Sequence, residues 1–144
     1  MAATAALLGT LLCTNADITY YTQQQIFWAN KYEANAAKLG KQETLEEKYW
    51  EAYDKCYYAE EDKEVKIGSQ VFASNCESSA IEYANLKVKN FNKELLDELM
   101  ELDIQYGIMK DMYETQLEAL RAQKESEATA ASTAAQDTGL LTGG

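Results

Sequence analysis

Pairs of acidic residues at helical spacing are the first feature of this sequence that could support chemistry. Glu98 and Glu101, and likewise Glu43 and Glu47, would lie on one side of a helix, and such pairs can hold two metal ions in four-helix bundles. Those metal sites also use histidine, and none of the 144 residues is a histidine. The pairs also fall on the polar side of their segments. We therefore predict no metal and no other cofactor.

Cysteine is the other residue type with a reactive side chain. Cys13, Cys56 and Cys76 are far apart and odd in number, and no CxxC pair occurs, which argues against a zinc site and against a closed disulfide framework. The simplest interpretation is three buried or half-exposed thiols. The alternative is a crosslink between subunits through Cys56 or Cys76, which would need an oxidising compartment. No paired base and no glycine-rich phosphate loop can be identified, so we predict that the protein is not an enzyme.

Aromatic residues are concentrated between Lys48 and Tyr58. This segment contains Tyr49, Trp50, Tyr53 and Tyr57. A cluster of this kind could stack on bases or sugars, but stacking sites for nucleic acids also carry basic residues. Residues 41–66 contain nine acidic and five basic side chains. Since Tyr and Trp are enriched in protein interfaces, we expect this aromatic face to pack against another helix or another subunit.

The charge of the whole chain narrows the choice of partners. Twenty-four acidic residues against 13 basic ones give a net charge of −11, and a surface of that sign repels phosphate backbones and anionic lipid headgroups. The sequence therefore predicts no binding to nucleic acid. Solubility, or docking to a basic partner surface, is the natural use of such charge.

The longest regular pattern in the chain runs from Ile81 to Ala122. Apolar residues recur there in two rows with a seven-residue period, which is the stripe of a long helix that packs lengthwise against another helix. One row is Ile81, Val88, Leu95, Leu102 and Met109, and the other is Leu99, Tyr106, Tyr113 and Leu120. The opposite side is charged and mostly acidic, as expected of a solvated helix face.

A second helix is predicted before this one. Ile18, Tyr32 and Leu39 lie on a common stripe from residue 17 onward, and Pro is absent from the chain. At Gly40 the stripe changes phase, which we interpret as a kink or phase slip in one long helix, with a true break as the alternative. Gly68 and Ser69 supply the better reversal. The predicted fold is all-α: a long antiparallel helical hairpin, coiled-coil-like, of residues 17–66 and 69–127.

The two ends of the chain differ from this hairpin. Residues 1–16 carry no charged side chain, have no basic start typical of a secretory signal, and are too short in their apolar part to span a bilayer. We expect an uncleaved apolar arm and no transmembrane segment, with a cleaved signal as the alternative. Residues 128–144 are rich in Ala, Thr and Gly, and such a low-complexity tail is expected to be mobile on its own.

Two short elements have the form of an export signal. Tyr57 and Glu61, and Tyr58 and Asp62, have the Tyr-x-x-x-acid spacing found in small helical-hairpin secreted proteins. The Trp-x-Gly turn that defines that family is absent, and no membership is inferred. In organisation, with an uncharged N-terminus and paired long helices, the chain is similar to filament subunits exported without a cleaved signal.

These patterns lead to a structural role. One hairpin has too little interior to bury all of its aromatic and aliphatic stripes, so we expect copies to associate with one another and possibly with other structural proteins. The expected function is a self-assembling subunit of a filament, a secretion system or a virion, at the cell surface or outside the cell. The alternative is a soluble acidic chaperone or scaffold that masks a partner. The residues predicted to make these contacts are Trp28, Tyr32, Tyr49, Trp50, Tyr53, Tyr57, Leu95, Leu99, Leu102, Tyr106, Met109 and Tyr113.

Overall fold

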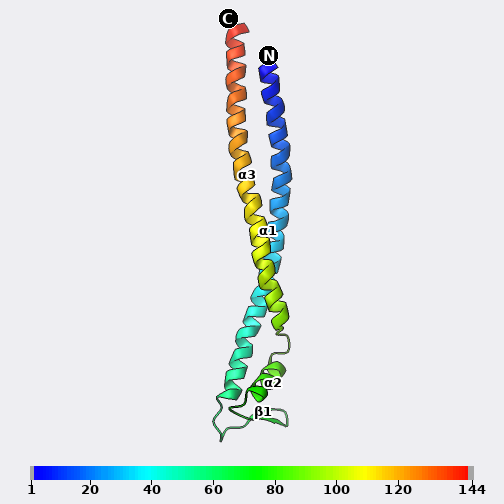
Figure 1. Ribbon diagram of the computed structural model, residues 1–144, viewed down its shortest axis with the longest axis vertical. Helices are drawn as coiled ribbons and strands as arrows, with labels where there is room; N and C mark the ends of the chain where they lie inside the picture. Colours follow the sequence, from blue (N-terminus) through cyan, green and yellow to red (C-terminus); the bar gives the residue numbers. More distant parts are fainter. Residues whose placement is uncertain (1, 143–144) are drawn as a thin grey trace. The chain divides into compact units, whose positions relative to one another are not determined.

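Two long helices dominate the structure. The computed structural model describes the backbone of residues 2–142 and the side chains of residues 5–136. Its elements are α1 (Ala2–Tyr57), β1 (Val65–Ile67), β2 (Gln70–Phe72), α2 (Glu77–Lys87) and α3 (Lys93–Thr142) (Figure 1). Because α1 and α3 pack against each other and little sheet is present, the predicted all-α helical hairpin is confirmed.

The chain divides into two compact units. The first unit combines residues 1–33 with residues 104–144, and the second consists of residues 34–103. Each unit therefore contains part of α1 and part of α3, and the second also contains both strands and α2.

The first unit is an antiparallel pair of helical segments. Thr14 Oγ1 lies 2.6 Å from Glu127 Oε2, and Gln25 Nε2 donates a hydrogen bond of 3.2 Å to Glu114 Oε1. The contacting residue numbers fall along α3 as they rise along α1, so the two segments run in opposite directions. Thr14 is almost fully buried, and its hydroxyl is thus enclosed by the pairing.

The second unit begins with the same kind of pairing. Leu39 of α1 packs with Leu96 and Leu99 of α3 in a buried apolar cluster. Gln42 joins α1 to the chain that precedes α3: its Nε2 donates to the carbonyl oxygen of Asn90 (3.3 Å) and its Oε1 accepts from the backbone N–H of Asn92 (3.1 Å). Helix α3 starts at this point because the Asn92 side chain accepts a hydrogen bond from its first turn.

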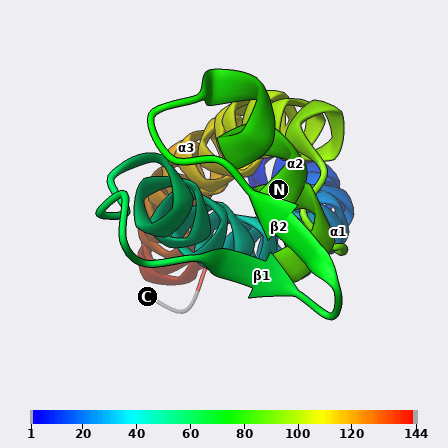
Figure 2. The ribbon, with the colours of Figure 1, turned by 90° about the horizontal axis from the view of Figure 1, so that it is seen from below.

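A small second core lies at the end of α1. Cys56 of α1, Val65 and Phe72 of the two strands, and Ala80 and Tyr83 of α2 are buried together. The strands form an antiparallel hairpin in which Val65 pairs with Phe72 and Ile67 with Gln70. Figure 2 shows this hairpin and α2 gathered beside the last turns of α1.

The segment between the long helices differs from the prediction. We expected a second helix over residues 69–127, but residues 70–72 are a strand, α2 ends at Lys87 and α3 begins only at Lys93. Gly68 does close a reversal, with φ of +60°, but the reversal joins two short strands rather than two helices. The first two residues of the predicted seven-residue row, Ile81 and Val88, therefore do not belong to the same helix as the others. Val88 is the C-cap of α2 and has non-helical backbone angles.

The N-terminal half of the hairpin is simpler than expected. Helix α1 continues through Gly40 without a break, and it begins at Ala2 rather than near residue 17. Residues 2–16 of the predicted arm are thus part of the helix, which agrees with their high content of Ala and Leu, two strong helix formers. Residue 1 lies outside the described residues. Thr10 also satisfies its hydroxyl within the helix, on the carbonyl oxygen of Ala6.

The low-complexity tail is likewise helical over most of its length. Helix α3 runs to Thr142, and Ala131 is buried. Ala-rich sequence favours helix because alanine loses no side-chain entropy on folding. The expectation of a separate tail from residue 128 therefore does not hold for the described residues, and Gly143 and Gly144 lie outside them.

Candidate functional site

The predicted contact residues fall into two groups, one in each unit. Within the first unit, Trp28 and Tyr106 have ring centroids 5.9 Å apart, and Tyr113 lies 5.7 Å from Tyr21. The side chains of Tyr32 and Met109 are half-buried. These residues pack α1 against α3 inside one chain. Their contacts therefore lie within the hairpin, not between subunits.

Two lysines complete the aromatic contacts of the first unit. Lys31 Nζ lies 4.9 Å from the ring centroid of Phe27 and 5.6 Å from that of Tyr106. Lys110 Nζ lies 5.2 Å from the centroid of Tyr32. A cation near the face of an aromatic ring is attracted by the ring's electrons. The chain therefore supplies its own cations to this aromatic group.

Within the second unit, Leu99 is buried, Leu102 is half-buried and Leu95 is partly exposed. The remaining predicted residues form a continuous aromatic run on α1, which consists of Tyr49, Trp50, Tyr53 and Tyr57. The structure brings these four together, as the sequence suggested.

The aromatic run lines a pocket. Tyr49, Trp50 and Tyr53 of α1, Glu77 of α2 and Phe91 of the connection to α3 surround a cavity of about 290 Å³. Trp50 is half exposed to solvent, whereas Tyr49 is buried. The sequence predicted Tyr49, Trp50 and Tyr53 as contact residues of an interface, but it predicted neither the pocket nor the part of Phe91 and Glu77 in it, which no local spacing connects to these rings.

Tyrosine ionisation is disfavoured in this pocket. Burial raises the pKa of Tyr49 above its ordinary value. Partial burial first, and then the negative charge of Glu77, raise the pKa of Tyr53. Because both hydroxyls stay protonated at neutral pH, they act as neutral hydrogen-bonding groups, and the only negative charges in the cavity wall are carboxylates.

An exposed apolar stripe on α3 was not identified from the sequence. Ile104, Ile108 and Met112, called the outer stripe below, expose 64%, 61% and 39% of their surface. They recur every four residues and so share one side of the helix. The four-residue spacing can be seen in the sequence. The two seven-residue rows beside it predict the apolar side of the helix, so the outer stripe falls on the side that is expected to be charged.

The described residues contain neither a candidate metal site nor a candidate membrane span. No group of three or more acidic or cysteine side chains within them is arranged to hold a metal ion. Over the same part of the chain, no helix has the length and apolarity needed to cross a membrane.

The three cysteines are free. Cys56 is buried, Cys76 is half-exposed and Cys13 is exposed. Cys76 precedes the first turn of α2, where the hydroxyl and N–H of Ser79 lower the pKa of its thiol. Burial raises the pKa of the Cys56 thiol.

Comparisons of the chain with protein-family models, with curated proteins and with solved structures found no match.

Proposed function

We propose that the protein is a structural subunit that associates with copies of itself through exposed helix faces. The observation that carries this proposal is the outer stripe, three large apolar residues exposed on one side of α3. Scattered exposed apolar residues are ordinary, but an aligned row is the kind of surface that helix partners cover.

A second exposed apolar row lies on α1, so the first unit has two apolar surfaces that another copy of the chain could contact. Leu8, Leu12 and Tyr20 on α1 are exposed by 49%, 69% and 53%, at intervals of four and eight residues. The pairing of Thr14 with Glu127 and the contact of Tyr32 with Gly107 fix how α1 and α3 align within this unit.

That alignment keeps the two rows apart. The outer stripe lies level with α1 residues beyond Phe27, so at about 1.5 Å per residue the rows are separated along the helices by at least about 10 Å. Two different surfaces on one subunit allow head-to-tail contacts, which build open polymers when the rotation between subunits does not close a ring. This favours a filament-like assembly over a closed dimer.

The net charge sets the conditions for such an assembly. Copies that each carry −11 repel one another, and added salt screens that repulsion while leaving apolar contacts intact. Self-association is therefore expected to strengthen with ionic strength. Binding to a basic partner would weaken instead, because salt screens attraction in the same way.

The proposal is tested by measuring mass against concentration and salt. We expect light scattering to show growth beyond a dimer, and negative-stain images to show extended particles. Ile108→Glu places a charge in the outer stripe and is expected to weaken association about 10- to 100-fold, from the loss of one buried isoleucine contact. Asn30→Asp adds the same charge at an exposed position of α1 and serves as the control.

The alternative function, an acidic chaperone or scaffold for a basic partner, predicts a different result. Such a protein would remain a monomer or dimer at every concentration, and Ile108→Glu would leave its mass unchanged. A concentration-independent small mass would reject the assembly proposal outright.

A further inference from the structure

The aromatic pocket of the second unit has the features of a binding site for a small cation. Three of its walls are rings from one helix: Tyr49 and Trp50 lie edge to face at 5.2 Å and 90°, and Trp50 and Tyr53 at 5.3 Å and 69°. Phe91 adds a fourth ring 5.1 Å from Tyr49. Because these rings are set edge to face rather than stacked, the aromatic lining is not one flat platform, which suits a compact rounded group rather than a flat one.

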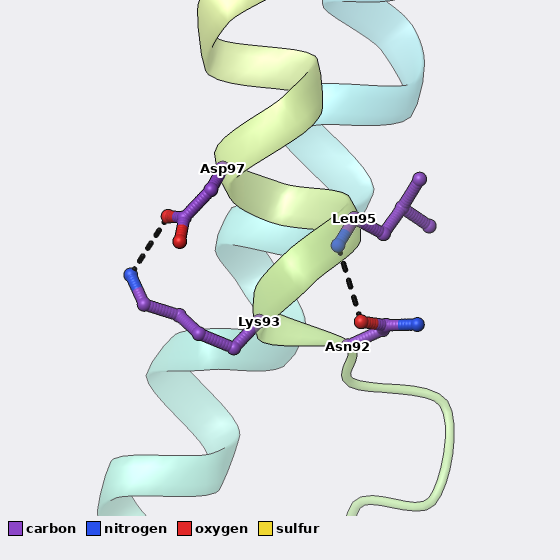
Figure 3. A network of polar contacts seen from close by, with 4 residues as sticks. All are labelled: Asn92, Lys93, Leu95 and Asp97. Carbon is purple, nitrogen blue, oxygen red and sulfur yellow. Dashed lines mark hydrogen bonds and ion pairs between the residues drawn. The ribbon is translucent and has the colours of Figure 1, made fainter.

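The charges around the cavity favour a cation. Glu46 and Glu77 line it together with the rings, and Lys93 is the single basic residue there. The ammonium of Lys93 is already engaged, because its Nζ lies 3.0 Å from Asp97 Oδ1 (Figure 3). That contact is the main reason why the pKa of Lys93 is raised. Glu46 contributes to this rise as well, so Lys93 partly offsets Glu46, and the two carboxylates of the wall still outnumber its one lysine.

Elsewhere in the chain, lysine side chains lie over the faces of aromatic rings. Lys31 lies over the ring of Phe27, Lys110 over Tyr32 and Lys87 over Tyr83. Within residues 5–136, no lysine or arginine lies in this way over Tyr49, Trp50 or Tyr53. These three rings include Trp50, and tryptophan is the strongest of the aromatic partners for a cation.

We propose that this pocket binds an alkylammonium group, a positively charged nitrogen with a short aliphatic body. The rings would hold the aliphatic body and face the charge, and Glu46 and Glu77 would balance it. Ile81 and Asn85 of α2 complete the wall with one apolar and one polar side chain. This inference does not depend on self-association, because the pocket belongs wholly to the second unit and the outer stripe to the first.

Choline and its uncharged isostere 3,3-dimethyl-1-butanol form a matched pair of probes. Titration is followed by NMR on the indole N–H signals of the two tryptophans, with Trp50→Leu used to assign them. We expect the Trp50 signal to shift saturably with choline, at an affinity of about 1 mM or tighter, and the Trp28 signal to stay in place. The alcohol is expected to bind at least about threefold more weakly, since it lacks the charge.

Substitutions locate the effect. Glu46→Gln and Glu77→Gln are each expected to weaken choline binding about 3- to 30-fold, whereas Glu47→Gln, which removes an exposed neighbouring charge that does not line the pocket, leaves it unchanged. Butylammonium, which has the form of a lysine side chain, separates the two sources of such a cation. Tighter binding of butylammonium than of choline points to a lysine of a partner protein, and the reverse to a free quaternary amine.

Three results would overturn the proposal: no saturable shift of the Trp50 signal up to about 50 mM choline, equal binding of choline and the alcohol, or equal weakening by Glu47→Gln and Glu46→Gln. Circular dichroism of each variant confirms that the helices remain. None of these results bears on the light-scattering test of assembly, so the two proposals can fail separately.

Discussion

Asn35 Nδ2 donates a hydrogen bond of 2.9 Å to the backbone carbonyl oxygen of Leu99, across the contact between α1 and α3 in the second unit. Asn35 is buried, with 5% of its surface exposed. A buried amide at the contact between two helices favours one register, because the hydrogen bond to this carbonyl oxygen is lost when the helices slide and a buried N–H without a partner is costly.

Replacing Asn35 by Asp is expected to lower the free energy of unfolding by about 3 kcal/mol at neutral pH. The carboxylate cannot donate, and it buries a negative charge beside a carbonyl oxygen. At acidic pH the carboxyl group is protonated and can donate again. Because burial raises its pKa in the native protein, the difference from wild type should begin to shrink above pH 4 and should be small once the pH reaches about 4, the pKa of an aspartate in an unfolded chain. Chemical denaturation at both pH values measures this. Asn30→Asp, at an exposed position of the same helix, should cost little; equal losses for both variants would contradict the role given to Asn35.

Polar residues on the seam also explain what could and could not be inferred from the sequence. Leu39, Leu99 and Tyr106 revealed their helices by spacing alone, since apolar periodicity reflects burial directly. Asn35 and Gln25 interrupted that periodicity and weakened the first stripe, although each makes a hydrogen bond across the hairpin. A single sequence does not distinguish a polar residue that bonds to a partner helix from one that faces water.

The connection between the long helices was the least predictable part. Its two strands have three residues each, too short for alternation to be recognised, and their burial depends on contacts with Cys56 and Tyr83, which belong to the helices on either side and follow no common spacing with the strands. The same dependence hid Phe91 and Glu77 as members of the pocket. Spacing along one helix revealed one wall of the site, whereas the other walls follow only from the tertiary fold.

Gly40 and Gly68 provide a second prediction because the same substitution should act in opposite directions. Gly40 lies within α1 and has no atom within 4 Å of the position that an added Cβ would occupy. Gly40→Ala is therefore expected to raise the free energy of unfolding by about 1 kcal/mol, the difference in helix propensity between the two residues.

Gly68 has equally open surroundings, but its φ is +60°, a conformation that costs an L-residue about 1–2 kcal/mol. Gly68→Ala should thus lower stability by a similar amount to the gain at Gly40. Thermal or denaturant unfolding of the two variants, measured side by side, provides the comparison. A loss of stability in Gly40→Ala would indicate that α1 is not helical through this point.

The cysteines offer a test of local structure around α2. Alkylation requires the thiolate, and Ser79 lowers the pKa of Cys76 by hydrogen bonding, from its hydroxyl first and then from its N–H. In the native protein the alkylation rate of Cys76 should therefore rise at lower pH than it does in the same chain unfolded in guanidinium. Iodoacetamide labelling, followed by mass spectrometry of the separate cysteine peptides, gives the two pH profiles.

Cys56 is the internal reference for that experiment. It is fully buried and its thiol pKa is raised by burial, so it should remain unlabelled in the native protein and react only after unfolding. Ser79→Ala removes the hydroxyl and should move the native Cys76 profile towards higher pH while leaving Cys56 protected. If Cys56 reacted as fast as Cys76 in the native protein, the strands and α2 could not be packed over the end of α1. If Ser79→Ala left the profile unchanged, the thiolate at Cys76 would owe nothing to the serine hydroxyl.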